Sequence, residues 1–237
     1  MFDVSIKVKK YPPPSSIETK TKPGVNKQMK KHQEHIVAVA ASLVTTREQG
    51  ICNIPDNIED HIVIKRRASL LNDFNYRKLI PLTVFMCNGK IAAFTRKMDH
   101  QHEALRGKVT VGIGGHFELG DLCHKNSVID IEMSVLKASA REVAEEVIVG
   151  EGTEILKTAT LPLVIAADET ITDRQYMALV SVVQLTKEDV LPNPEEDELD
   201  YRGWYNPAEL LDSGKYTNET WTNKICSAID SLGFGMR

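Results

Sequence analysis

The most informative part of this chain is VTVGIGGHFELGD at residues 109–121, followed by DIEMSVLKASAREVAEEVIV at residues 130–149. The first stretch predicts a strand that runs into a glycine-rich loop, where the missing side chains let a ligand approach the backbone closely. The second predicts a long amphipathic helix, because apolar residues recur near the 3.6-residue period and helix breakers are few. These apolar residues are Ile131, Val135, Ala138, Val143 and Val147.

Three acidic residues of the predicted helix, Glu142, Glu145 and Glu146, stand at i, i+3 and i+4 and therefore project from one face. Like charges this close repel each other. A hard divalent cation with oxygen ligands, Mg²⁺ above all, is their natural counter-charge. Arg141 precedes them and can hold one carboxylate by a bidentate contact. Taken alone, the cluster also fits an ordinary solvated helix face.

The glycine loop, an acidic residue six positions after Gly115, and R-E-x-x-E-E together resemble the signature of the Nudix hydrolases. That signature is G-x5-E-x7-R-E-U-x-E-E-x-G-U, in which U is a bulky aliphatic residue. Gly115 takes its first position, Asp121 stands where the first Glu is expected, and residues 141–146 fit its core. Nineteen residues, 122–140, separate Asp121 from Arg141 where the family has seven. Ile148 replaces the final glycine, so we expect the helix to lack its usual cap.

We interpret the twelve extra residues as an insertion that partly lengthens the helix at its N-terminal end. Four further segments look like the order found in a bacterial and phage branch of predicted Nudix phosphoesterases. They are RKLIPLTVFMCNGKIAAFTRK at 77–97, HEALRGKVTVGIGGH at 102–116, ELDYRGWYNPAELL at 198–211 and NETWTNKI at 218–225. The resemblance covers roughly residues 75–232.

The resemblance implies a metal-dependent hydrolase that cleaves a phosphoric anhydride bond in a nucleoside diphosphate linked to another moiety, or in a related nucleotide. It implies that Glu142, Glu145 and Glu146, with the carbonyl of Gly114, hold Mg²⁺ or Mn²⁺ on the diphosphate. Such an ion lowers the pKa of the water that attacks phosphorus, while a carboxylate accepts the proton. The implied catalytic residues are Arg141, Glu145 and Glu146.

Substrate contacts are expected from Gly115, His116, Arg106 and Arg174. His116 fits a hydrogen-bonded loop residue equally well, and Arg106 fits a surface ion pair with Glu103. Family members often recruit a further acid from a distal loop, and three candidates stay open, namely Glu169, Asp173 and Glu198. A base commonly stacks on an aromatic ring. The nominated rings are Phe74, Tyr76 and Tyr176.

Two other functions stay open. The first is a nucleotide-binding module that has lost turnover, which Asp121 and Ile148 favour and the intact R-E-x-x-E-E disfavours. The second is an enzyme like the isopentenyl diphosphate isomerases, which also show a GGH loop but need a cysteine in a particular setting. Cys87, within FMCNGK, does not resemble that setting.

The remaining pattern predicts an α+β fold, an α/β/α sandwich with a mixed β-sheet flanked by helices and preceded by an N-terminal extension. Strands are expected at 35–44, 159–166 and 176–185, and a last helix near 218–232. Asn88-Gly89 between two β-rich halves of 79–95 predicts a type I′ hairpin. Residues 1–31 are predicted to be a basic flexible extension and residues 32–237 a single domain.

Composition excludes several classes of protein. The 237 residues are 42% hydrophobic and 26% charged with four scattered cysteines, which excludes a collagen, a disulfide mini-protein and a wholly disordered chain. No apolar run approaches the roughly 18 residues of a spanning helix, and no signal peptide is evident, so a cytoplasmic protein without membrane contact is expected. The basic extension carries Lys without Arg or interleaved aromatics, so a nucleic-acid partner is not expected. The expected partner is a small-molecule nucleotide or diphosphate substrate, and a homodimer stays open.

Overall fold

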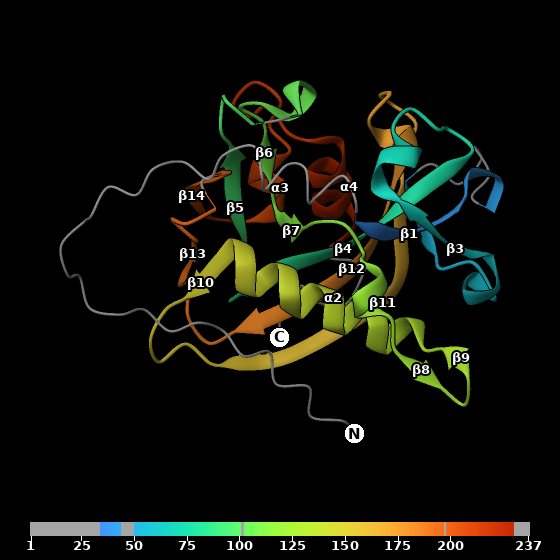
Figure 1. The fold of residues 1–237 in the computed structure, drawn as a ribbon. Helices are drawn as coiled ribbons and strands as arrows, with labels where there is room; N and C mark the ends of the chain where they lie inside the picture. Colours follow the sequence, from blue (N-terminus) through green and yellow to red (C-terminus); the bar gives the residue numbers. More distant parts are fainter. Residues whose placement is uncertain (1–33, 44–49, 101, 197, 230–237) are drawn as a thin grey trace.

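The computed structural model describes residues 34–43, 50–100, 102–196 and 198–229. Helix α2 (Ile131–Glu146) lies on one face of a mixed β-sheet, while α3 (Pro207–Leu210) and α4 (Thr220–Ala228) lie on the other (Figure 1). The predicted α/β/α sandwich is therefore confirmed. The expected basic extension, residues 1–31, lies outside the described residues. Among the residues that are described, no helix combines the length and apolar character that crossing a membrane requires.

The sheet is built around β4 (Tyr76–Cys87), which pairs in parallel with β12 (Tyr176–Leu185). The other pairs are antiparallel, and the order along the main path is β14-β5-β4-β12-β11-β2. Strands β1 and β7 also pair with β4, β3 with β1, and β6 with β5. Their bounds are β1 (His35–Ala40), β2 (Gly50–Asn53), β3 (Ile62–Arg66), β5 (Lys90–Arg96), β6 (Val109–Thr110), β7 (Gly112–Gly114), β11 (Ile155–Ala166) and β14 (Leu199–Tyr205).

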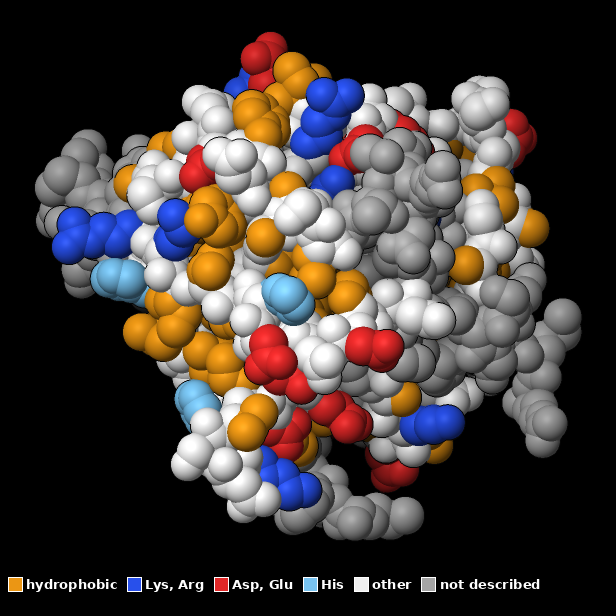
Figure 2. Space-filling view, turned by 90° about the vertical axis from the view of Figure 1, so that its right-hand side faces the viewer, with side chains coloured by type: hydrophobic (Ala, Val, Ile, Leu, Met, Phe, Trp, Pro, Cys, Tyr) orange, Lys and Arg blue, Asp and Glu red, His pale blue; other side chains and the backbone are white. Residues whose placement is uncertain are grey.

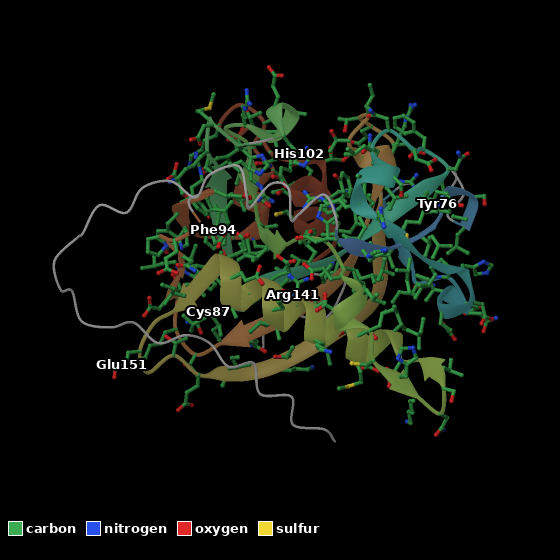
Figure 3. The ribbon with its side chains drawn as sticks, in the orientation of Figure 1. Tyr76, Cys87, Phe94, His102, Arg141 and Glu151 are labelled. Atoms are coloured by element: carbon green, nitrogen blue, oxygen red, sulfur yellow. The ribbon has the colours of Figure 1, made fainter. Side chains whose placement is uncertain are left out.

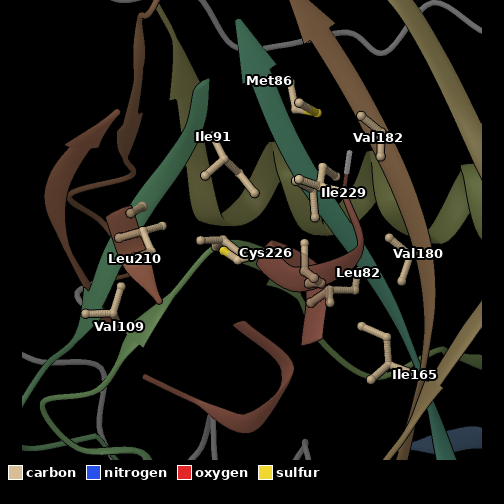
Figure 4. Packing of buried hydrophobic residues seen from close by; sticks show 14 of the residues in the cluster. Leu82, Met86, Ile91, Val109, Ile165, Val180, Val182, Leu210, Cys226 and Ile229 are labelled. Carbon is tan, nitrogen blue, oxygen red and sulfur yellow. The ribbon is translucent and has the colours of Figure 1, made fainter. Parts of the chain in front are cut away.

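Strand β4 is almost wholly buried because both of its faces are covered. Its side chains alternate with the period of two that strands impose. Leu82, Val84 and Met86 face the core under α4, as Figure 4 shows for Leu82 and Met86 beside Cys226 and Ile229. Leu79 and Phe85 belong to the clusters under α2.

The predicted helix over 130–149 begins and ends inside that range. Asp130 caps its N-terminus by accepting a hydrogen bond from the backbone N–H of Met133 at 3.0 Å. At the other end, Val147–Val149 form strand β10, which pairs with β13 (Val190–Pro192). The helical prediction for residues 147–149 was therefore wrong, because pairing with β13 outweighs the helical period there.

A glycine is not needed after α2, because Asn193 caps the helix from outside. Its backbone N–H donates to the carbonyl of Glu146 at 2.8 Å, and its Nδ2 donates to the carbonyl of Glu145 at 2.7 Å. These bonds satisfy carbonyls that the end of a helix leaves without partners. The structure thus explains Ile148, which lies in β10 instead of at a cap.

The insertion forms a small hairpin and the first turns of α2. Strands β8 (His124–Lys125) and β9 (Val128–Ile129) pair antiparallel across Asn126 and Ser127, which have φ values of 53° and 65°. Helix α2 then starts ten residues before Arg141, so part of the insertion does lengthen the helix at its N-terminal end.

The other predicted elements differ from the structure mainly at their ends. The Asn88-Gly89 turn is confirmed, with φ values of 49° and 75° as a type I′ turn requires. The strand predicted at 35–44 ends at Ala40 and continues as the 3₁₀ turn η1 (Ala41–Leu43). Strand β11 begins four residues before the predicted 159, and β12 matches its predicted range. The short helix α3 was missed.

Candidate active site

A cavity of about 520 Å³ opens where α2 approaches the glycine loop. Its walls come from α2, β7, the segment between β5 and β6, the segment before β12, and the start of α4. Figure 3 shows Arg141 on α2 and His102 on the segment above that helix, and both residues line the cavity. Among the predicted site residues, those that line it are Gly114, Gly115, His116, Arg141, Glu142, Glu145 and Glu146.

Close contacts require glycine at Gly114, the last residue of β7, and at Gly115, which follows it. A Cβ placed on Gly115 would overlap both carboxylate oxygens of Glu142, and one placed on Gly114 would overlap the backbone carbonyl of Pro81. The Glu142 carboxylate therefore rests directly on the Gly115 backbone. This contact joins the loop to the acidic turn of α2, which is the turn that carries Glu142, Glu145 and Glu146.

Arg141 holds several acids of the site together. Its Nε and Nη2 bind Asp121 Oδ1 and Oδ2 at 3.1 and 2.8 Å, in a bidentate pair. Its Nη1 binds Glu142 Oε1 at 2.8 Å, and its Nη2 also donates to the carbonyl of His116 at 2.9 Å. Asp121 is buried. Its side chain is shorter than that of the Glu in the signature but still reaches the arginine. Asp121 thus anchors Arg141, a role that the sequence analysis did not assign.

The acids of the site differ in their surroundings. Burial raises the pKa of Glu142 to about 7, with Arg141 lowering it and Glu145 raising it further. Burial lowers the pKa of Arg141, but the hydrogen bond and charge of Asp121, together with the charge of Glu142, hold it above its usual value. The Glu145 side chain is 51% exposed, whereas that of Glu142 is 7% exposed.

The residues present fit a divalent metal by their chemistry. Carboxylate and carbonyl oxygens are the ligands that Mg²⁺ and Mn²⁺ prefer. Burial and like charges raise the pKa of Glu142, and a nearby cation would favour its charged form. Within the described part of the chain, no three His, Cys, Asp or Glu side chains already stand at metal-binding positions.

The predicted distal acids fall into two groups. Asp173 and Glu198 line the cavity, whereas Glu169 does not and pairs with Lys224 at 2.7 Å. Asp173 Oδ2 accepts hydrogen bonds from the backbone N–H and the hydroxyl of Thr170 and from the hydroxyl of Thr220. Glu198 lies 3.6 Å from His100 Nε2.

Two predicted substrate contacts do not line the cavity. Arg106 donates from Nε to the carbonyl of His100 at 2.8 Å, which braces the segment that carries His102. Arg174 lies within η7 (Asp173–Gln175) and is exposed. Of the rings nominated for base stacking, Tyr176 lines the cavity, while Phe74 and Tyr76 do not.

The sequence analysis missed several lining residues. Arg96 binds Glu219 at 2.8 Å, with both side chains mostly buried. Trp221 lines the cavity, and its Nε1 is buried without a hydrogen-bond partner in the structure. Glu219 and Trp221 fall in NETWTNKI, so that quoted segment was the available signal. Nothing local singles out Arg96, because its partner lies 123 residues away.

A buried arginine holds the far wall of the cavity in place. Arg77 contacts Asp168 at 2.5 Å and donates to the carbonyls of Ala167 and Asp173 at 3.0 and 3.2 Å. It thereby fixes the segment that brings Asp173 and Tyr176 to the cavity.

Figure 2 shows the face of the molecule on the β1 and β3 side, where acidic side chains gather in the lower half near hydrophobic and histidine side chains.

Comparisons with known proteins identify the fold. No protein-family model matches the chain, and no curated protein matches it. Among solved structures it is similar to Tm1382, a candidate Nudix hydrolase, with a TM-score of 0.61 and 19% identity over 84% of this chain and 100% of that chain. A NUDIX-family hydrolase from Clostridium perfringens matches at a TM-score of 0.39, with 15% identity over 66% of this chain and 97% of that chain. A MutT/nudix family protein from Enterococcus faecalis matches at 0.39, with 14% identity over 69% and 64%. The similarity to Tm1382 shows that this chain has the same fold, the Nudix fold.

Proposed function

We propose that this chain, which has the Nudix fold, is a metal-dependent hydrolase of a phosphoric anhydride bond. The substrate is a nucleoside diphosphate linked to another moiety, or a related nucleotide. One observation carries the proposal: Glu142, Glu145 and Glu146 from one region of α2 line the same cavity as the Gly114-Gly115 loop. An acidic face that merely served solubility would have no reason to meet a glycine loop inside a cavity.

Glu142, Glu145 and Glu146, with the carbonyl of Gly114, would hold Mg²⁺ or Mn²⁺. When bound, the ion neutralises charge on the diphosphate and lowers the pKa of the attacking water. Glu145 and Glu146 are the candidates to accept the proton of that water. Arg141 acts as a positioning residue, because Asp121 fixes its guanidinium and the guanidinium in turn holds Glu142.

The cavity also supplies substrate contacts and a distal acid. Gly115 and His116 stand beside the acidic turn, where they can meet the diphosphate. Glu198 is the better candidate for the distal acid, because Asp173 already accepts several hydrogen bonds that join two segments of the fold. The isomerase alternative finds no support, since Cys87 is fully buried in β4 and does not line the cavity.

Chromatographic detection of the phosphomonoesters formed from a panel of nucleotides with Mg²⁺ tests the proposal, because cleavage of the anhydride leaves one phosphate on each product. Glu145→Gln should lower the rate by roughly 10²-fold or more, as loss of a proton acceptor does. Glu132→Gln is the matched control, because Glu132 is exposed at the other end of α2 and does not line the cavity. Nucleotide binding without Mg²⁺-dependent turnover on any substrate would instead identify a binding module.

A further inference from the structure

The cavity has a second wall, made of aromatic and histidine rings. His100 and His102 lie with ring centroids 5.8 Å apart, and His102 meets Tyr176 at 6.5 Å in an edge-on arrangement. His116 meets Tyr176 from another side at 6.1 Å. Lys78 Nζ lies 4.1 Å from the centroid of the Tyr176 ring. One ring face of Tyr176 is thus covered by an ammonium group.

Positive charge converges on this wall. Arg67, at the start of η4 (Arg67–Leu70), lines the cavity with His102. Burial lowers the pKa of His102, and the charges of His100, Lys78 and Arg67 lower it further. Burial and the charge of Arg67 likewise lower the pKa of Lys78, to about 8. The charges of Arg67 and Lys78 therefore act on this wall, and they are opposite in sign to the carboxylates of α2.

His100 contacts two neighbours. The backbone N–H of His102 donates to His100 Nδ1 at 3.1 Å. His100 Nε2 points toward Glu198, at 3.6 Å. His100 thus orients the segment, while His102 and His116 remain the histidines of the wall beside Tyr176.

We propose that Arg67, His102 and His116 form a phosphate subsite of the cavity that does not require the metal. The substrate then carries a phosphoryl group that protein cations hold, in addition to the oxygens that face the acidic turn. Arginine suits this role because its planar fork binds two phosphate oxygens at once, and imidazole donates a further hydrogen bond. The assignment of this phosphoryl group to the substrate rests on the proposed function, whereas phosphate binding itself does not.

The carboxylate of Glu34 competes with phosphate for the guanidinium of Arg67. This carboxylate lies 3.5 Å from Arg67 Nη1 and also lines the cavity. A phosphate at Arg67 must share the guanidinium with that carboxylate. Removing the Glu34 charge should therefore strengthen phosphate binding.

Isothermal titration of the full chain with inorganic phosphate, in EDTA and at low salt, tests the subsite. We expect one binding site that Arg67→Ala and His102→Ala each weaken about tenfold or more, because each removes a hydrogen bond to a charged group. Glu34→Gln should tighten it. Arg66→Ala is the matched control, since Arg66 is the exposed neighbour with the same charge and does not line the cavity, and it should leave the affinity unchanged.

No binding in EDTA, or equal binding by Arg67→Ala, His102→Ala and the wild type, would overturn the subsite. A second titration contains Mg²⁺ and inorganic pyrophosphate. If pyrophosphate competes with phosphate, the result supports the subsite as the place of a phosphoryl group of the substrate. If the two ligands bind independently, that assignment is overturned and free phosphate is the ligand of the subsite. Turnover without phosphate binding refutes the subsite alone, and phosphate binding without turnover refutes the proposed function alone.

Discussion

At the scale of single residues, the contact between Gly115 and Glu142 controls where the acidic turn meets the loop. Gly115 does not have a positive φ, so glycine is required there because a side chain would overlap the Glu142 carboxylate. Arg141 and Asp121 complete the same unit by fixing the carboxylate from the other side. The position of the Glu142 carboxylate thus depends on three neighbours, Gly115, Arg141 and Asp121.

Gly115→Ala should displace the Glu142 carboxylate and weaken Mn²⁺ binding by about tenfold or more, as loss of a supporting contact does at metal sites. Calorimetric titration with Mn²⁺ measures this. Gly120→Ala is the control from the same loop region, because a Cβ there meets nothing within 4 Å. Equal affinities for the two variants would show that the contact does not position the acid.

Lys78 gives a pH dependence of stability with a defined sign. Burial and Arg67 lower its pKa from 10.5 to about 8. Between these values the unfolded chain holds a proton that the folded chain has released, so stability rises with pH. Relative to Lys78→Met, the free energy of unfolding of the wild type should rise from pH 8 to 10.5 by up to about 3 kcal/mol.

Urea denaturation of both proteins across this range measures the difference. Lys125→Met, on the exposed strand β8, serves as the control for loss of a lysine. A difference between wild type and Lys78→Met that stays flat from pH 8 to 10.5 would contradict the shifted pKa.

At the scale of elements, helix α2 is specified at its two ends by different means. Asp130 caps its start locally, three residues before the bonded amide. Its end depends on Asn193, which follows β13, the strand paired with β10, and donates from Nδ2 to the carbonyl of Glu145. The last turn carries Glu145 and Glu146, so the distant cap also supports the acids of the cavity.

Asn193→Ala should lower the free energy of unfolding by about 1–3 kcal/mol, because the carbonyl of Glu145 loses its external hydrogen bond. Amide exchange in the last turn of α2 should accelerate.

Ile148→Gly introduces the glycine of the Nudix signature and should also lower the free energy of unfolding, by about 1 kcal/mol, since the position is in a strand. Stabilisation by Ile148→Gly would show that a local glycine cap is preferred after all.

At the scale of the whole molecule, a buried ion pair joins the end of strand β5 to the start of helix α4. Arg96 lies at the end of β5 and Glu219 immediately before α4, with side chains 14% and 10% exposed. Burial lowers the pKa of Arg96, and the charge and hydrogen bond of Glu219 raise it above its usual value. The pair closes one side of the cavity.

Arg96→Met and Glu219→Leu should each lower the free energy of unfolding by about 3–5 kcal/mol, because each leaves one buried charge without its partner. The double variant should recover much of that loss, since no buried charge remains. Denaturant unfolding of the four proteins of this cycle gives the coupling. Additive single effects would mean that the two residues stabilise the fold independently.

Local signals in the sequence predicted the elements that depend on near neighbours. Asn88-Gly89 specifies its turn because both positions need positive φ. The face shared by Glu142, Glu145 and Glu146 follows from helical geometry alone. The boundary error at residues 147–149 arose where a partner strand, β13, outweighed the local period.

The sequence by itself determined the sandwich of sheet and helices, the glycine loop and the acidic helical face. The sandwich follows from the order of the predicted elements, and the loop and the acidic face follow from the spacing of residues within one segment. Tertiary structure alone determined the role of Asp121, the cap from Asn193, the Arg96–Glu219 pair and the wall formed by His102 and Tyr176. These contacts join segments that are distant along the chain. They form only when strand order and register bring the segments together, so no local pattern encodes them.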